Sequence, residues 1–109
     1  MNVGSRFNLP EAIAQYSKLM SLRRDMRQLS KPALAEKFDV TPSVIRTIDE
    51  MGRHPSVSDE DARLIVACLN ERDAVQRELE RMPSPEQIAA AQGMSLSYLR
   101  RVVGEAKSR

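Results

Sequence analysis

The sequence predicts an all-α fold made of two similar units, each a longer helix followed by two short helices that meet at a tight turn. Apolar residues recur at three- and four-residue spacing along most of the chain. No segment shows sustained apolar–polar alternation, or the Asn-Gly or Asp-Gly pair that is typical of a β-hairpin. The pair of short helices is encoded twice, at residues 30–51 and 84–104, with a constant offset of 54 residues.

Composition narrows the class of protein. The chain has 109 residues, enough for one domain or two very small ones, and its apolar content of 41% is sufficient for a core. No apolar run approaches the roughly 20 residues needed to span a bilayer, and the start of the chain has no charged-then-apolar signal pattern. With one cysteine, no intramolecular disulfide can form. We therefore expect a cytoplasmic protein that does not enter membranes.

The first long helix is expected over residues 9 to about 28. Residues 1–8 lack periodicity and are predicted to form a flexible N-terminus. Asn8 can cap the helix, and Glu11 stands where a capping-box acid belongs. Together with the first pair of short helices, this helix would form a three-helix unit over residues 9–52.

The first pair of short helices lies within residues 30–51. Ser30 can cap one helix and Thr41 the other, and a proline follows each cap in the first turn, where its missing N–H leaves no partner unsatisfied. Asp39 falls where the chain must turn. The apolar residues at helical spacing on the facing sides are Leu34, Ala35, Phe38, Val44, Ile45 and Ile48.

A linker, residues 53–58, precedes a long helix over 59 to about 82. Ser58 can cap this helix, and three acidic residues in its first turn suit the helix dipole. Prolines at 83 and 85 end it. Its apolar stripe is interpreted as internal core; the alternative is a homodimer through the 59–82 helix.

The second pair of short helices, residues 84–104, completes a second unit over 59–104 and precedes a flexible tail, 105–109. Ser84 and Gln87 form a capping-box start. The residues that correspond at the offset of 54 are Ile88 and Leu34, Ala89 and Ala35, Gln92 and Phe38, Gly93 and Asp39, Ser95 and Thr41, Leu99 and Ile45, Arg100 and Arg46, and Val102 and Ile48.

Both stretches resemble the helix-turn-helix of bacterial and phage DNA-binding proteins. In that family an apolar residue and Ala occupy the first helix, apolar–Gly–apolar forms the turn, and a polar cap precedes two apolar anchors. The first copy departs at Asp39, where the family most often has Gly, and Asp tolerates left-handed backbone. The second copy has Gly93 and departs at the polar Gln92. The resemblance implies a tandem helix-turn-helix regulator of phage or mobile-element type that binds specific double-stranded DNA.

The residues expected to contact DNA lie on or beside the second helix of each motif: Thr41, Ser43, Arg46, Thr47, Arg53, His54, Ser95, Ser97, Tyr98, Arg100 and Arg101. Arg46 and Arg100 are the main base-reading candidates, because arginine can form two hydrogen bonds to guanine. For Arg53 and His54 the sequence leaves two interpretations open, a basic pair on the DNA backbone or an ordinary exposed linker. Residues 1–50 and 83–109 each carry a net charge of +2 and residues 51–82 carry −2, as expected if the ends contact phosphate.

No pattern predicts catalysis. One His and one Cys do not make a typical zinc site, and there is no Walker loop and no GxGxxG. We expect a cytoplasmic, nucleoid-associated transcription regulator that is not an enzyme and needs no metal or cofactor. The alternative is a protein-interaction module that contacts RNA polymerase or a replication or packaging machine, with at most one motif on DNA.

Overall fold

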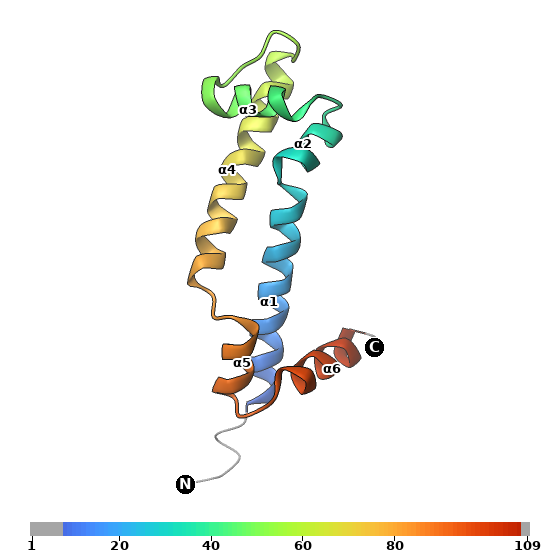
Figure 1. Cartoon of the computed structure of the whole chain (residues 1–109), viewed down its shortest axis with the longest axis vertical. Coiled ribbons are helices and arrows are strands. Elements are labelled where there is room, and N and C mark those ends of the chain that lie inside the picture. The colour runs from blue at the N-terminus through green and yellow to red at the C-terminus, as the bar shows by residue number, and fades with distance from the viewer. Residues whose placement is uncertain (1–7, 108–109) are drawn as a thin grey trace. The chain divides into compact units, whose positions relative to one another are not determined.

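The computed structural model describes residues 8–107, and this part of the chain forms six α-helices and no strand (Figure 1). The helices are α1 (Leu9–Gln28), α2 (Lys31–Lys37), α3 (Pro42–Met51), α4 (Asp59–Arg81), α5 (Pro85–Ala91) and α6 (Leu96–Lys107). The all-α prediction is confirmed, and each pair of short helices follows a longer helix, as expected. Within the described residues, none of the helices combines the length and the apolar character needed to cross a bilayer.

The chain ends differ in part from expectation. Of the predicted flexible segments, 1–8 and 105–109, residues 1–7 and 108–109 lie outside the described residues. Helix α6 continues to Lys107, three residues past the predicted end of the second motif at Gly104. The reason is that Gly104 keeps helical backbone, unlike Gly52, whose φ of 77° ends α3.

The helices pack into two compact units, residues 22–80 and a second unit that joins residues 8–21 to 81–107. This division differs from the predicted one, which placed the boundary in the 53–58 linker. The first half of α4 packs back on the pair of short helices that precedes it. Helix α1 is divided between the two units, whereas α4 lies in the 22–80 unit except for its last residue, Arg81.

The core of the 22–80 unit is formed where α3 lies across the beginning of α4 (Figure 1). Its buried members come from α2, α3 and α4: Leu34, Ala35, Val44, Ile45, Ile48, Ile65 and Leu69. Each fully buried Ile or Leu contributes about 1.5–3 kcal/mol relative to an exposed one. The apolar stripe of α4 is thus used within the chain as core, which was the preferred interpretation.

The second unit brings the beginning of α1 together with α5 and α6. Its buried residues are Ala12, Tyr16, Leu19, Pro85, Ile88, Ala89, Leu99 and Val103. Asn8 caps α1 as predicted, because its Oδ1 accepts the backbone N–H of Glu11 (3.1 Å). The N–H of Asn8 itself donates to Oε1 of Gln92, 3.0 Å away. Gln92, the polar residue that departs from the motif, therefore satisfies a donor at the start of α1.

Replacing Gln92 by Leu should lower the free energy of unfolding by about 1 kcal/mol, because the N–H of Asn8 loses its protein acceptor. Gln92→Glu keeps an acceptor and adds negative charge beside a helix N-terminus, so it should preserve stability or raise it by a few tenths of a kcal/mol. Urea unfolding followed by circular dichroism measures both variants. Equal losses in the two variants would show that Gln92 contributes something other than this hydrogen bond.

Candidate nucleic-acid interface

The first helix of each motif begins with the same side-chain cap. Oγ of Ser30 accepts the N–H of Ala33 (3.2 Å), and Oγ of Ser84 accepts the N–H of Gln87 (3.1 Å). Ser84 and Gln87 complete the predicted capping box, since the Gln87 side chain accepts the N–H of Ser84 (2.8 Å). The starts of α2 and α5 are therefore determined by local sequence.

The turn between the two helices closes with the same backbone hydrogen bond in both motifs. The carbonyl of Ala35 accepts the N–H of Val40 (2.9 Å), and the carbonyl of Ala89 accepts the N–H of Met94 (3.0 Å). These two alanines are 3% and 2% exposed, so only a small side chain fits where the helices cross.

One residue of each turn has left-handed backbone. Asp39 has φ of 55° and is the only non-glycine residue with positive φ in the described part of the chain, and Gly93 has φ of 72°. An Asp is among the residues that tolerate this conformation, whereas Gly adopts it without steric strain. The substitution of Asp for Gly therefore leaves the turn geometry unchanged.

The second helix of each motif also has an equivalent cap. Oγ1 of Thr41 accepts the N–H of Val44 (3.4 Å), and Oγ of Ser95 accepts the N–H of Tyr98 (3.1 Å). Both cap residues are exposed at the N-terminal ends of α3 and α6. Their hydroxyls and the neighbouring backbone N–H groups lie at the end of each helix that favours anions.

The outward side of α3 holds the predicted residues of the first motif. Ser43, Arg46 and Glu50 are exposed, and Thr47 is half-buried. The hydroxyl of Thr47 donates to the carbonyl of Ser43 (3.0 Å), so its proton is directed into the helix. Arg46 is therefore the residue of α3 best placed to reach a base edge.

Arg53 and His54 follow α3 in the linker. Arg53 is exposed, whereas His54 is half-buried and its Nδ1 accepts the backbone N–H of Ser56 (2.9 Å). This bond leaves the proton of a neutral imidazole on Nε2. His54 thus helps to shape the turn, and Arg53 is the more exposed residue of the pair.

The outward side of α6 holds the residues of the second motif. Ser97, Arg100 and Arg101 are exposed, and Tyr98 is half-buried. The guanidinium of Arg101 lies over the Tyr98 ring, 5.3 Å from its centroid. The stacked ring limits the rotamers of Arg101 and holds its charge near the surface of the helix.

The two helices of each motif are joined by different contacts. Nζ of Lys31 lies 3.3 Å from Oδ2 of Asp49, an exposed ion pair that joins α2 to α3. At the same register in the second motif stand Pro85 and Val103, and both are buried. Val102, which the sequence predicts as an apolar anchor of this helix, is only half-buried, and Val103 is the buried residue instead.

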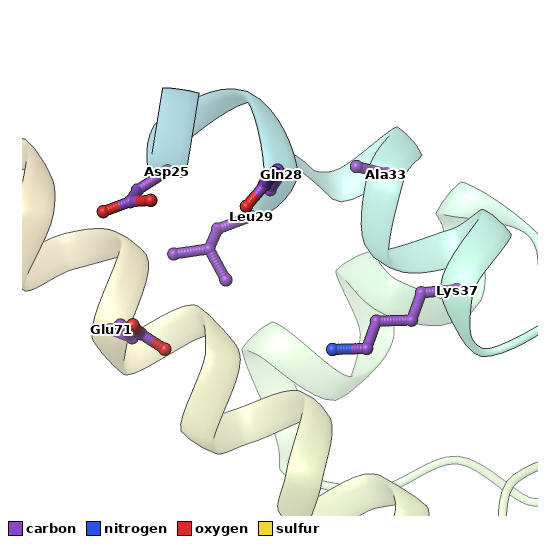
Figure 2. A pocket seen from close by; sticks show the side chains of 6 residues that line it. All are labelled: Asp25, Gln28, Leu29, Ala33, Lys37 and Glu71. Atoms are coloured by element: carbon purple, nitrogen blue, oxygen red, sulfur yellow. The ribbon is translucent and has the colours of Figure 1, made fainter. Parts of the chain in front are cut away.

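A pocket of about 460 Å³ lies beside α2 in the 22–80 unit (Figure 2). Its lining comes from α1, α2, α4 and the residue after α1: Asp25, Gln28, Leu29, Ala33, Lys37 and Glu71. Figure 2 shows carboxylates of α1 and α4 on one side and the ammonium of α2 on the other. No residue of α3 takes part, so the pocket is separate from the outward side of that helix.

No family model, curated protein or solved structure matches the chain. Among residues 8–107, no three His, Cys, Asp or Glu side chains are grouped so that they could hold a metal ion. The hydrogen bond from Asn8 to Gln92 was not predicted from the sequence. Gly104 was not predicted as a site residue, although the offset of 54 pairs it with Glu50 on the outward side of α3.

Gly93→Ala should lower the free energy of unfolding by about 1–2 kcal/mol, since a side chain at this φ crowds the backbone. Asp39→Gly is the matched control and should be neutral or slightly stabilising, because it relieves the same crowding at the equivalent turn. Thermal and urea unfolding measure both. An unchanged midpoint for Gly93→Ala would contradict the assigned role of the left-handed turn.

Proposed function

We propose that this chain is a small, sequence-specific double-stranded DNA-binding protein that regulates transcription, of phage or mobile-element type. In this proposal α3 and α6 each enter a major groove, which is wide enough to admit an α-helix. The remaining helices support these two and bury their apolar sides.

One observation carries the proposal. Arg46 and Arg100 occupy equivalent, exposed positions on the second helix of two motifs whose caps and turns share hydrogen bonds at a constant offset. A single arginine on a helix is commonly a solvated surface residue. Two at the same register, each presented by the same local geometry, favour a shared recognition role.

The polar groups around each arginine support this role. Thr41 and Ser43 lie at the start of α3, with their hydroxyl oxygens 3.0 Å apart. Ser95 caps α6, and Ser97 is exposed one turn before Arg101. Short hydroxyl side chains and helix N-termini are common phosphate contacts that fix the register of a protein on DNA. Arginine can then read guanine through O6 and N7.

A second candidate is a protein-interaction module that contacts RNA polymerase or a replication or packaging machine. The observation that favours it is Met51 at the end of α3, which is 69% exposed. It lies next to Glu50, an acidic residue that phosphate would repel. Exposed apolar surface of this kind is more typical of a protein contact than of a DNA contact.

Selection from a random pool of double-stranded DNA should enrich one defined site. Affinity for that site should fall with salt, with a log–log slope of about −0.9 per neutralised phosphate. Arg46→Ala and Arg100→Ala should each cost about 1–3 kcal/mol and relax the preference at a different base position. Absence of any enriched site, or binding that salt does not weaken, would contradict the proposal and favour the interaction module.

A further inference from the structure

The two motifs present unequal surfaces when they are compared residue by residue. The outward residues of α3 are Ser43, Arg46, Thr47 and Glu50, and those of α6 at the same register are Ser97, Arg100, Arg101 and Gly104. In each helix these four positions lie on one side, because residues three, four and seven apart are neighbours. The two faces therefore correspond in position and differ in their side chains.

Charge is the first difference. On α3 the positive Arg46 is offset by the negative Glu50, so the four residues sum to zero. On α6 Arg100 and Arg101 contribute +2, and one acid, Glu105, follows four residues after Arg101, so the α6 face together with this neighbour keeps a charge of +1. Electrostatic attraction to the phosphate backbone supplies much of the affinity for a duplex. This attraction therefore favours contact of the duplex with α6 over contact with α3.

The second difference is the last residue of the face. Gly104 lies four residues after Arg100 and three after Arg101, where Glu50 stands on α3. A Cβ at Gly104 would meet no atom of the described chain within 4 Å, and its backbone is not in the left-handed region. Glycine within a helix is less stable than alanine, and the left-handed freedom of glycine is not used at this position. A surface without a side chain one turn after two arginines suits the close approach of another backbone.

We infer that the α6 face, residues 97–104, is the principal duplex contact of this chain and that Gly104 is where the DNA backbone comes closest to the helix. This inference rests on the proposed function. The stacked Arg101 reduces the ordering cost of the contact, because the Tyr98 ring already restricts it. The α3 face then contributes less affinity, and its neutral charge suits a selective role.

Equilibrium binding of the full chain to its selected duplex tests the inference. Arg100→Ala should weaken binding at least about fivefold more than Arg46→Ala, since its charge is not offset by a neighbouring acid. Thermal unfolding is recorded for each variant to confirm that it remains folded. If the wild-type chain binds no duplex, the proposed function itself fails. If it binds and Arg46→Ala is the more damaging change, only the assignment of α6 fails.

Gly104 has its own test with a matched control. Gly104→Leu should weaken binding about tenfold or more, because the side chain would separate the helix from the DNA backbone. Ala106→Leu adds comparable bulk to another exposed position on the same helix, outside the face 97–104, and should leave affinity unchanged. Gly104→Ala should raise the unfolding temperature while lowering affinity. Equal affinities of Gly104→Leu and the wild type would overturn the assignment of Gly104.

Discussion

The tight turn inside each motif is the constraint on which the rest of the structure depends. A single left-handed residue, Asp39 or Gly93, reverses the chain. The carbonyl of Ala35 or Ala89 then closes the turn by accepting the backbone N–H of the residue that follows, Val40 or Met94. This geometry sets how the two short helices cross. It buries one side of α3 and α6 and leaves the opposite side outward. Every proposed contact with DNA follows from that division of each helix into two sides.

Most of the fold could be predicted because the information is local. Caps such as Ser30, Thr41 and Ser58 bond to amides three residues away, so their positions mark helix starts in the sequence alone. Ser84 and Ser95 do the same in the second motif. The apolar spacing assigned the buried sides, and the repeated offset identified the second motif even though its apolar residues differ from those of the first.

What could not be predicted depends on pairs that are distant in sequence. The bond from Asn8 to Gln92 spans 84 residues, and no local pattern connects a helix start with a glutamine so far along the chain. The ion pair of Lys31 and Asp49 is equally invisible, because either charge alone is typical of a solvated surface. The outward faces were predictable as positions. Their difference in charge is also present in the sequence, whereas the exposure of each position depends on the fold.

In the proposed function, two locally specified motifs present their outward helix faces to a duplex, and α6 contributes most of the affinity. The most direct measurement is an amide NMR titration of the ¹⁵N-labelled chain with its selected duplex at moderate salt. The proposed contact of α6 with DNA predicts the largest shift changes at residues 95–104, smaller changes at residues 41–50, and little change in the middle of α4. Changes confined to α4, or an α6 that does not respond to saturating DNA, would contradict it.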